Sequence, residues 1–375
     1  MKKTVSVLLA LALVLFVGAG ALADTIKIGG IAPLTGPVSS YGILVREGAD
    51  LYIEELNQAG GLLDAQVEII WMDDTHDAVE ATNAYNQLVS DGVVALVGPV
   101  TTTPTLAAAS RAAQDNMPLI SPSATAYDVT SAGPNVFRTC FLDPFQAELL
   151  AQMAFETLGA AKVAVLFDNT NDYSIGLSES FKAKSEELGM EVVAVEAAVE
   201  GDADYTPQLI KIADAEPDAV IVCYYYETGA LVLRQAVDVG LEAYMLGADG
   251  WAGIEKQLLD APELLDKAFY CDQFSAADES AVVQGFVASF SEKYGKTPTM
   301  FNALGYDTAK VLLTAIGNAG TTEDRAAIVA AIKATDLDCT TGHITFDDHN
   351  DPIKSAFMMG FVDGEPTLKV RIDPK

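Results

Sequence analysis

Residues 162–197 have the sequence KVAVLFDNTNDYSIGLSESFKAKSEELGMEVVAVEA, and this stretch decides the fold. Its apolar start predicts a strand over Lys162–Asp168, and a similar run predicts a strand over Glu191–Ala197. Between these runs, Gly176–Leu188 has the pattern of a helix. A strand, a helix and another strand in this order predict a βαβ unit with a right-handed crossover.

The same alternation extends along most of the chain. An earlier series of strands and helices is predicted at Ile26–Ile31, Tyr41–Gln58, Val67–Met72, Val79–Val89, Val93–Val97, Thr103–Gln114 and Pro118–Ser121. A later series adds Phe145–Leu158, Pro207–Ala213, Ala219–Tyr225, Gly229–Val239, Ala243–Leu246 and Ala268–Cys271 around the quoted stretch. These strands are too continuously apolar to be half exposed, which predicts parallel sheets that are covered on both faces.

Two series of this kind predict two lobes, because roughly 350 residues are too many for one compact core. Three further helices, predicted at Ala281–Tyr294, Phe301–Ala319 and Glu323–Ala334, are long enough to return to the first sheet. Short strands are expected from His343 to the end of the chain. We therefore expect residues 24–143 plus 275–340 to form one doubly wound, Rossmann-like α/β lobe. Residues 144–274 plus 341–375 would form the other, joined to the first by a multi-strand hinge that can close around a ligand.

The first 23 residues have the features of an export signal. Lys2 and Lys3 precede an apolar run from Val5 to Val17, and the segment ends in small residues at Ala21 and Ala23. The alternative is an uncleaved membrane anchor, since the run is nearly long enough to span a bilayer. A lipid anchor would need a cysteine just after the run, but the first cysteine is Cys140. We expect a cleaved signal and a soluble protein in the periplasm or outside the cell.

The charge balance excludes several partners. The chain has 22 Lys and Arg against 53 Asp and Glu, a net charge of −31. Such a protein is repelled by nucleic acid and by anionic lipid surfaces. The strong negative charge therefore favours a role in solubility rather than in recognition.

Four cysteines are too few and too scattered for a disulfide scaffold or a Cys-x-x-Cys metal site. Cys223 lies in an apolar run and is expected to be buried. One disulfide, between Cys271 and Cys339, is possible in an oxidising compartment, although the sequence leaves the pairing open.

Candidate ligand-binding residues follow the predicted strands, where open α/β sheets bind ligands. Four such loops are distinctive: Pro33–Gly42, Val97–Pro104, Ile120–Thr125 and Asp168–Gly176. The hydroxyls of Thr102, Thr103 and Thr125, together with free N–H groups at a helix start, could hold a carboxylate without an arginine. The alternative for Thr102 or Thr103 is ordinary helix N-capping.

Asp249 follows another predicted strand, and its carboxylate could face a ligand ammonium group. The alternative is a turn carboxylate that bonds to nearby backbone, which is common for Asp-Gly. The aromatic candidates for the walls of a site are Tyr41, Tyr173, Tyr224 and Phe301. The alternative is packing alone, which is the more common role of a single aromatic residue.

Motifs for catalysis or metal binding are absent from the sequence. It contains no Gly-x-Ser-x-Gly elbow, no phosphate loop and no His-Glu-x-x-His, and its three histidines are not spaced as metal ligands. Asp347–Asp351 resembles a calcium loop but lacks the central glycine and the distant glutamate, so we expect a solvated turn. We therefore expect no cofactor, no metal and no enzyme activity.

The ordered set of loop motifs resembles the type I periplasmic binding proteins of the branched-chain amino acid (leucine/isoleucine/valine) uptake family. The motifs are Ile28–Gly42, Asp91–Thr102, Met117–Thr130, Phe137–Gln146, Val163–Gly176, Glu227–Ala236 and Thr341–Pro352. The resemblance implies that Thr102 meets a ligand carboxylate and that Ser123, Ala124 and Thr125 contact the amino-acid head group. It also implies aromatic walls at Tyr41, Tyr173, Tyr224 and Phe301. Asp249 takes the place of a family glutamate that pairs with the α-ammonium group, and it is one methylene shorter.

The resemblance further implies an amino-acid receptor without a cofactor, which delivers its ligand to an ABC permease and acts as a monomer. Within the same fold, the ligand could instead be an amide, urea or an aromatic acid. A secreted enzyme, such as a hydrolase that uses Asp249 or Cys223, is a second hypothesis, and a sensory or structural ligand-binding module is a third. The hydrolase lacks a nucleophile and base pair in the motif loops.

Overall fold

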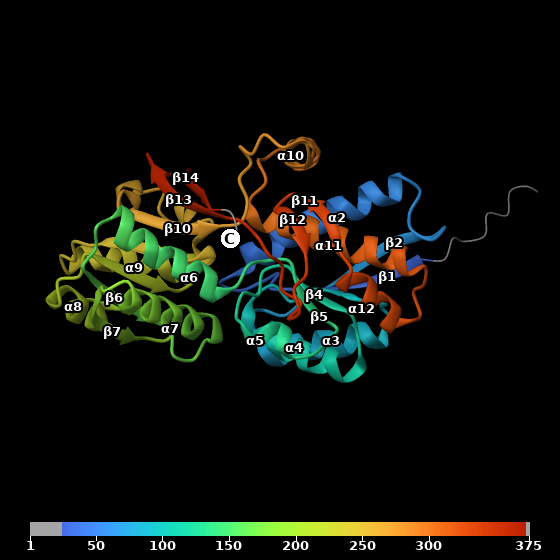
Figure 1. Ribbon diagram of the computed structural model, residues 1–375, viewed down its shortest axis with the longest axis horizontal. Helices are drawn as coiled ribbons and strands as arrows, with labels where there is room; N and C mark the ends of the chain where they lie inside the picture. Colours follow the sequence, from blue (N-terminus) through green and yellow to red (C-terminus); the bar gives the residue numbers. More distant parts are fainter. Residues whose placement is uncertain (1–24, 373–375) are drawn as a thin grey trace, which may run out of the picture.

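The computed structural model describes residues 25–372 as two α/β lobes that lie side by side (Figure 1). The predicted export signal, residues 1–23, lies outside the described residues. The first lobe contains a five-stranded parallel sheet in the order β2-β1-β3-β4-β5. Its strands are β1 (Thr25–Ala32), β2 (Gln66–Asp73), β3 (Leu96–Val97), β4 (Leu119–Ser121) and β5 (Val136–Arg138).

The second lobe contains a seven-stranded sheet in the order β14-β13-β10-β9-β8-β6-β7. Its strands are β6 (Lys162–Phe167), β7 (Glu191–Ala197), β8 (Ala219–Cys223), β9 (Tyr244–Gly247), β10 (Ala268–Asp272), β13 (Ala356–Val362) and β14 (Glu365–Ile372). The last two are antiparallel to their neighbours, and the other five are parallel. The βαβ unit predicted for residues 162–197 is confirmed, because β6 and β7 pair in parallel from Lys162 and Glu191 onward.

Helices cover the sheets. The first lobe carries α2 (Ser39–Gln58), α3 (Ala78–Ser90), α4 (Thr102–Asp115), α5 (Asp128–Ser131), α10 (Ala281–Tyr294), α11 (Met300–Ala319) and α12 (Arg325–Lys333). The second carries α6 (Asp143–Gln152), a π-helical turn η1 (Met153–Thr157), α7 (Asp172–Glu187), α8 (Thr206–Asp214), α9 (Tyr226–Asp238) and the 3₁₀ turns η2 (Asp249–Trp251), η3 (Ile254–Gln257) and η4 (Pro262–Leu265). Every residue of β4 and β8 is buried, as expected for strands covered on both faces.

Three segments cross between the lobes, and they contact one another. The first runs from β5 to α6, the second follows β10, and the third precedes β13. The side-chain Oε1 of Gln273 on the second accepts the N–H of Phe141 on the first at 2.8 Å. On the third, the Lys354 Nζ donates to the carbonyl of Thr139 at 2.6 Å. This is a multi-strand connection of the kind that permits hinge closure.

The predicted lobe boundary between residues 340 and 341 falls inside a hairpin. Strands β11 (Asp336–Cys339) and β12 (Gly342–Thr345) pair antiparallel, and Ile344 packs in the same core as Ile28 and Val97 of the first lobe. The hairpin therefore belongs with the first sheet. We propose that the boundary lies after β12, where the chain leaves that core.

The possible disulfide between Cys271 and Cys339 is not formed. All four cysteines are free and buried. Cys271 lies on β10 in the second lobe and Cys339 on β11 in the hairpin, so their sulfurs are held in different sheets. Burial raises the pKa of both thiols, which keeps them protonated.

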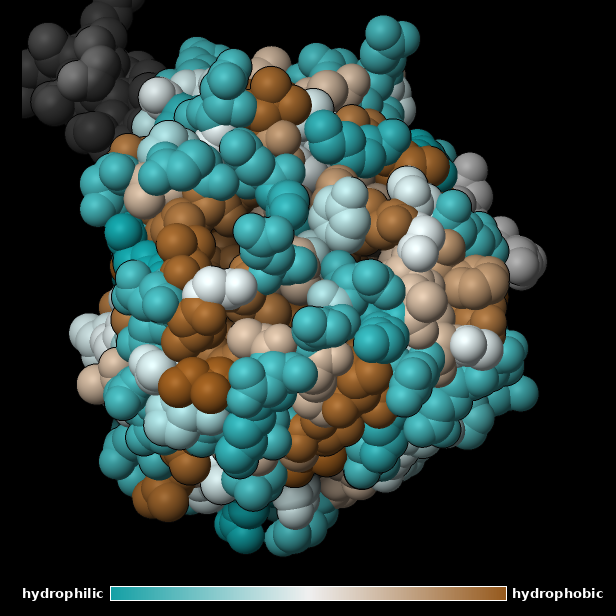
Figure 2. Space-filling model, turned by 90° about the vertical axis from the view of Figure 1, so that its left-hand side faces the viewer, coloured by the Kyte–Doolittle hydropathy of each residue, from teal (hydrophilic) through white to brown (hydrophobic). Residues whose placement is uncertain are grey.

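Among residues 25–372, no helix is both long and apolar enough to cross a membrane. Figure 2 shows the end of the molecule formed by the second lobe, where hydrophilic side chains surround several areas of hydrophobic ones. From the elements of this lobe, Val195, Ile210 and Val237 are exposed. Single exposed aliphatic side chains of this kind are normal on a protein surface.

Candidate ligand-binding cleft

A narrow cavity of about 10 Å³ lies between the two lobes. From the first lobe it is lined by Tyr41, Val100, Thr101, Thr102, Ser123, Thr125 and Phe301, and from the second by Tyr173, Tyr225, Asp249 and Gly250. The structure therefore brings together most of the residues singled out from the sequence. Thr103, Ala124 and Tyr224 do not line the cavity.

The hydroxyl-rich wall is built from the loops after β3 and β4. Helix α4 begins at Thr102, and its N-cap residue Thr101 makes no capping bond, because the Thr101 hydroxyl lies 2.8 Å from Nδ1 of His76. The N-capping alternative for Thr102 and Thr103 is therefore not what the structure contains. The Ser123 hydroxyl donates to the carbonyl of Val100 at 2.7 Å, which ties the two loops together. Backbone N–H groups at the start of α4 remain available for an anion.

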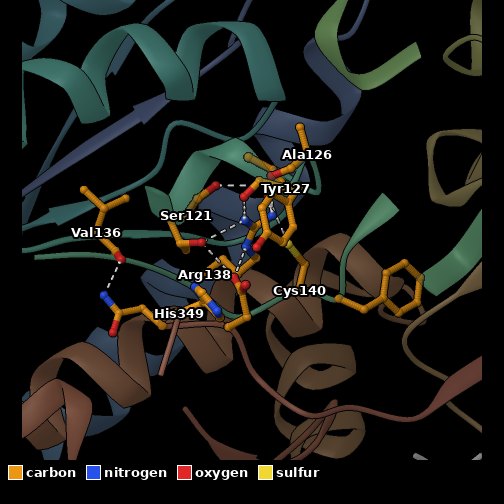
Figure 3. Close-up of polar contacts among 12 residues, drawn as sticks. Ser121, Ala126, Tyr127, Val136, Arg138, Cys140 and His349 are labelled. Atoms are coloured by element: carbon orange, nitrogen blue, oxygen red, sulfur yellow. Dashed lines mark hydrogen bonds and ion pairs between the residues drawn. The ribbon is translucent and has the colours of Figure 1, made fainter. Parts of the chain in front are cut away.

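Arg138 stabilises the loop after β4, which carries Ser123 and Thr125, through hydrogen bonds to its carbonyl groups (Figure 3). Its side chain is fully buried and uses its N–H groups on the carbonyls of Ala124, Ala126 and Tyr127, at 2.8–3.1 Å. Its remaining N–H groups reach the Asp351 carboxylate at 2.6 Å and the Thr130 hydroxyl at 3.1 Å. The loop that carries Ser123 and Thr125 is thus held by one side chain with all its donors satisfied.

The predicted solvated turn at Asp347–Asp351 is wrong for its last two residues, because Asn350 and Asp351 are buried. The Asn350 side chain donates to the carbonyl of Val136 at 3.0 Å. Asp351 is buried, because its carboxylate pairs with Arg138 and accepts a hydrogen bond from Thr130 at 3.0 Å. Asp347 itself closes the turn by accepting the backbone N–H groups of His349 and Asp351. Within residues 25–372, no group of three or more His, Cys, Asp or Glu side chains could hold a metal ion.

Asp249 forms the acidic wall in the second lobe. Its carboxyl is buried, and Oδ1 accepts hydrogen bonds from Gln146 Nε2 at 3.1 Å and the Tyr173 hydroxyl at 3.2 Å. The Asp249 N–H donates to Oε1 of Gln146 at 2.9 Å. Burial raises the pKa of Asp249 to about 6, and the bonds from Gln146 and Tyr173 oppose this rise.

Two glycines allow this wall to form. A Cβ on Gly247 would lie 2.0 Å from the Trp251 ring, so the strand β9 can end against Trp251 only without a side chain. A Cβ on Gly250 would lie 2.6 Å from the Tyr173 hydroxyl and 2.9 Å from the Tyr225 ring. Both aromatic rings can therefore approach the backbone beside Asp249.

Each lobe contributes one stacked aromatic pair to the cavity. Tyr41 stacks on Phe301 with ring centroids 4.2 Å apart, and Tyr173 stacks on Tyr225 at 4.9 Å. Tyr225 is the aromatic wall residue that sequence reasoning missed, and Val100, Thr101 and Gly250 also line the cavity without having been predicted. Strand β8 ends at Cys223, two residues before the predicted end, so Tyr224 and Tyr225 lie between this strand and α9, which begins at Tyr226.

Tyr224 points elsewhere. Its hydroxyl donates to the carbonyl of Ala198 at 2.7 Å, and its ring packs against Tyr205 with centroids 5.4 Å apart. The predicted wall position at Tyr224 is therefore taken by its neighbour Tyr225.

Thr103 and Ala124 lie close to the cavity but do not line it. The Thr103 hydroxyl is 3.5 Å from the Asp172 carboxylate, so it faces the second lobe at the edge of the cleft. Ala124 is fully buried, and its backbone N–H donates to the Ser121 hydroxyl at 3.1 Å. A role for either residue in ligand binding stays a prediction.

The lobes contact each other beside the cavity. The Tyr226 hydroxyl donates to the carbonyl of Pro37 at 2.9 Å, and the Tyr226 N–H lies 3.3 Å from the Tyr41 hydroxyl. That hydroxyl in turn donates to the carbonyl of Gly250. Tyr41 therefore belongs both to the cavity wall and to the contact that closes it.

The comparison with protein families decides what this architecture is. The family model for periplasmic binding proteins matches residues 25–365. The chain belongs to this family. The resemblance drawn from the loop motifs is thereby confirmed, and the family is one of solute-binding proteins rather than of enzymes.

Individual relatives are similar to this chain over nearly its whole length. The leucine-, isoleucine-, valine-, threonine- and alanine-binding protein of Pseudomonas aeruginosa is 32% identical, over 91% of this chain and 91% of that protein. A leucine-binding protein from Thermotoga maritima has a TM-score of 0.88 and 34% identity, over 93% of this chain and 99% of that one. A branched-chain amino acid substrate-binding protein from Streptococcus pneumoniae, solved with isoleucine, has a TM-score of 0.86 and 31% identity with the same coverage.

Proposed function

We propose that this periplasmic binding protein captures an amino acid with a branched or other apolar side chain and delivers it to an ABC transporter permease. The observation that carries the proposal is the buried carboxyl of Asp249, which faces the hydroxyl-bearing loops of the other lobe across one cavity. A zwitterion has the two charges that such walls complement. The similarity to amino-acid-binding relatives supports the same ligand class.

Each wall has a distinct part in this proposal. The ligand carboxylate would meet the start of α4 and the hydroxyls of Thr102, Ser123 and Thr125. The ammonium group would meet Asp249, and the aromatic pairs would enclose the side chain. Because aspartate is one methylene shorter than the family glutamate, the ammonium group would lie deeper in the second lobe.

Capture follows from contacts made by both lobes. A ligand that touches Thr102 on one lobe and Asp249 on the other binds the closed form better than the open one, and so shifts the equilibrium toward closure. The permease would then recognise the closed arrangement. We propose that the protein acts as a monomer outside the cytoplasm and that residues 1–23 are the cleaved export signal.

A panel of amino acids should separate the ligand candidates. Leucine, isoleucine or valine, at roughly one hundred times its dissociation constant, should stabilise the folded protein by about 2.7 kcal/mol. Thermal-shift measurements would show this as a raised melting temperature. The deaminated analogue 4-methylpentanoate should give little or no shift, since it lacks the cation that Asp249 requires. A larger shift with the deaminated acid or with an aromatic acid would refute the proposed ligand class.

Replacing Tyr225 with alanine should weaken amino-acid binding by about 1.5–3 kcal/mol, the usual cost of losing a buried aromatic side chain. Tyr224→Phe should leave binding unchanged, because it removes only the hydroxyl that bonds to Ala198 outside the cavity. Calorimetric titrations of both variants would check this. A greater loss of affinity in Tyr224→Phe than in Tyr225→Ala would mean that Tyr224, and not Tyr225, forms the wall of the site.

A further inference from the structure

Two buried carboxyls beside the cavity share one amide. Asp143, the first residue of α6, is 0% exposed, and Asp249 is 3% exposed. Gln146 Nε2 donates to Oδ1 of Asp143 at 2.9 Å and to Oδ1 of Asp249 at 3.1 Å. Its Oε1 accepts the Asp249 N–H, which fixes the orientation of the amide. Gln146 therefore positions Asp249 through both its backbone and its side chain.

Asp143 also reaches the opposite wall. Its N–H donates to the carbonyl of Thr125 at 2.9 Å, and Thr125 lines the cavity. Oδ2 of Asp143 is enclosed and receives no well-formed hydrogen bond, although the Thr125 side chain lies close enough to oppose the rise of the Asp143 pKa. Asp143 thus connects the hydroxyl wall of one lobe with the acidic wall of the other.

No described cation neutralises this pair. Neither Asp143 nor Asp249 forms an ion pair with a Lys, Arg or His among residues 25–372. The charge of Arg138 opposes the rise of the Asp143 pKa, but the N–H groups of Arg138 are all engaged with other partners. A neutral amide cannot cancel two negative charges in an enclosed site.

The other titratable groups around the pair do not supply a charge of the right sign. They are Cys140 on the first crossover, Tyr173 on α7, Cys223 at the end of β8, Tyr225 before α9, and Cys271 and Asp272 on β10. Burial raises the pKa of each of these groups, so the thiols and phenols stay neutral. Asp272, whose pKa burial raises to about 7, would only add negative charge.

Two neighbouring carboxyls without a cation cannot both ionise easily, and they titrate as a unit. Burial and the charge of Asp249 raise the pKa of Asp143 to about 8. The pair therefore retains a proton near neutral pH.

We propose that an ammonium-bearing ligand displaces this proton, and that Asp143, which does not line the cavity, thereby helps to select ligands that carry an amine. The inference rests on the proposed function. When the ligand –NH₃⁺ group enters, both carboxyls ionise and the proton leaves to solvent, so one positive charge replaces another. A ligand without the cation cannot make this exchange.

Calorimetry of leucine binding at about pH 7, in phosphate and in Tris buffer, tests the exchange. The two buffers differ in their heat of protonation, so the difference in binding heat counts the protons released. We expect roughly one proton per leucine for the natural chain, because the pair is left doubly ionised. Asp143→Asn keeps an oxygen for Gln146 but cannot hold the proton, so its release should fall to near zero.

Asp74→Asn is the matched control. Asp74 is also fully buried, has an enclosed Oδ2 without a hydrogen bond, and has a pKa raised to about 7. Unlike Asp143, it does not share the amide of Gln146 with Asp249 and does not shift the pKa of either carboxyl of the pair. This variant should release as many protons as the natural chain. Equal binding heats in the two buffers for the natural chain, or undiminished release in Asp143→Asn, would overturn the inference.

A measurement without ligand keeps this result separate from the proposed function. The unfolded chain ionises Asp143 near pH 4, whereas the folded protein holds the proton up to about pH 8. Asp143 therefore contributes stability that is present below about pH 4 and lost as the pH rises through about 8. The melting temperature of Asp143→Asn should fall less than that of the natural chain between about pH 5 and pH 9. Parallel pH profiles would show that Asp143 holds no proton, whereas failure of every amino acid to bind would refute the proposed function.

Discussion

Replacing Asp249 with alanine should weaken leucine binding by about 2–5 kcal/mol, because a desolvated ligand ammonium group is left without its partner. This corresponds to a loss of roughly 30- to 5,000-fold in affinity. The large effect is expected because Asp249 is buried and already oriented by Gln146 and Tyr173. Isothermal titration of the natural chain and the variant would measure the difference.

Asp249→Asn is the control for shape. It keeps a side-chain oxygen within reach of Gln146 and Tyr173 but removes the negative charge, so most of the loss should remain. The deaminated analogue 4-methylpentanoate provides the complementary control, since its weak binding should not worsen in either variant. An unchanged leucine affinity in Asp249→Ala would remove this residue from the site.

The strands that the sequence predicts best are those with continuous apolar runs. Strand β7 occupies the predicted range Glu191–Ala197, and α10 occupies the predicted range Ala281–Tyr294. Strands β5 and β11 are not predicted, because one has only three residues and ends in an arginine and the other is Asp-Leu-Asp-Cys. Their strand conformation depends on pairing with other strands, since β5 pairs with β4 and β11 with β12.

The sequence predicts site residues only where they lie in loops that directly follow predicted strands. The hydroxyl loops and Asp249 could be placed at the cleft from their position after apolar runs. Gln146 and Arg138 could not be assigned roles in this way, although both lie in the Phe137–Gln146 motif. Gln146 acts on Asp249, 103 residues away, and Arg138 acts on Asp351, 213 residues away. Such contacts leave no local pattern.

Replacing Arg138 with methionine should lower the free energy of unfolding by about 3–5 kcal/mol, the cost of leaving one partner of a buried ion pair uncompensated. Asp351 would stay buried without its cation, and the carbonyls of Ala124 and Ala126 would lose their donors. Urea denaturation followed by circular dichroism would measure the change. Because these carbonyls belong to the loop of Ser123 and Thr125, leucine affinity should fall in the same variant.

Two comparisons separate the buried pair from a general effect of losing an arginine. Arg234 pairs with Asp260 at the surface, and Arg234→Met should cost no more than about 1 kcal/mol. The double variant Arg138→Met/Asp351→Asn removes the stranded charge and should therefore recover part of the stability lost in Arg138→Met. Equal losses in Arg138→Met and Arg234→Met would mean that burial adds nothing to the pair. In that case the loop of Ser123 and Thr125 would be held by its other hydrogen bonds, such as that from the Ser123 hydroxyl to Val100, and Arg138 would have no positioning role in the cleft.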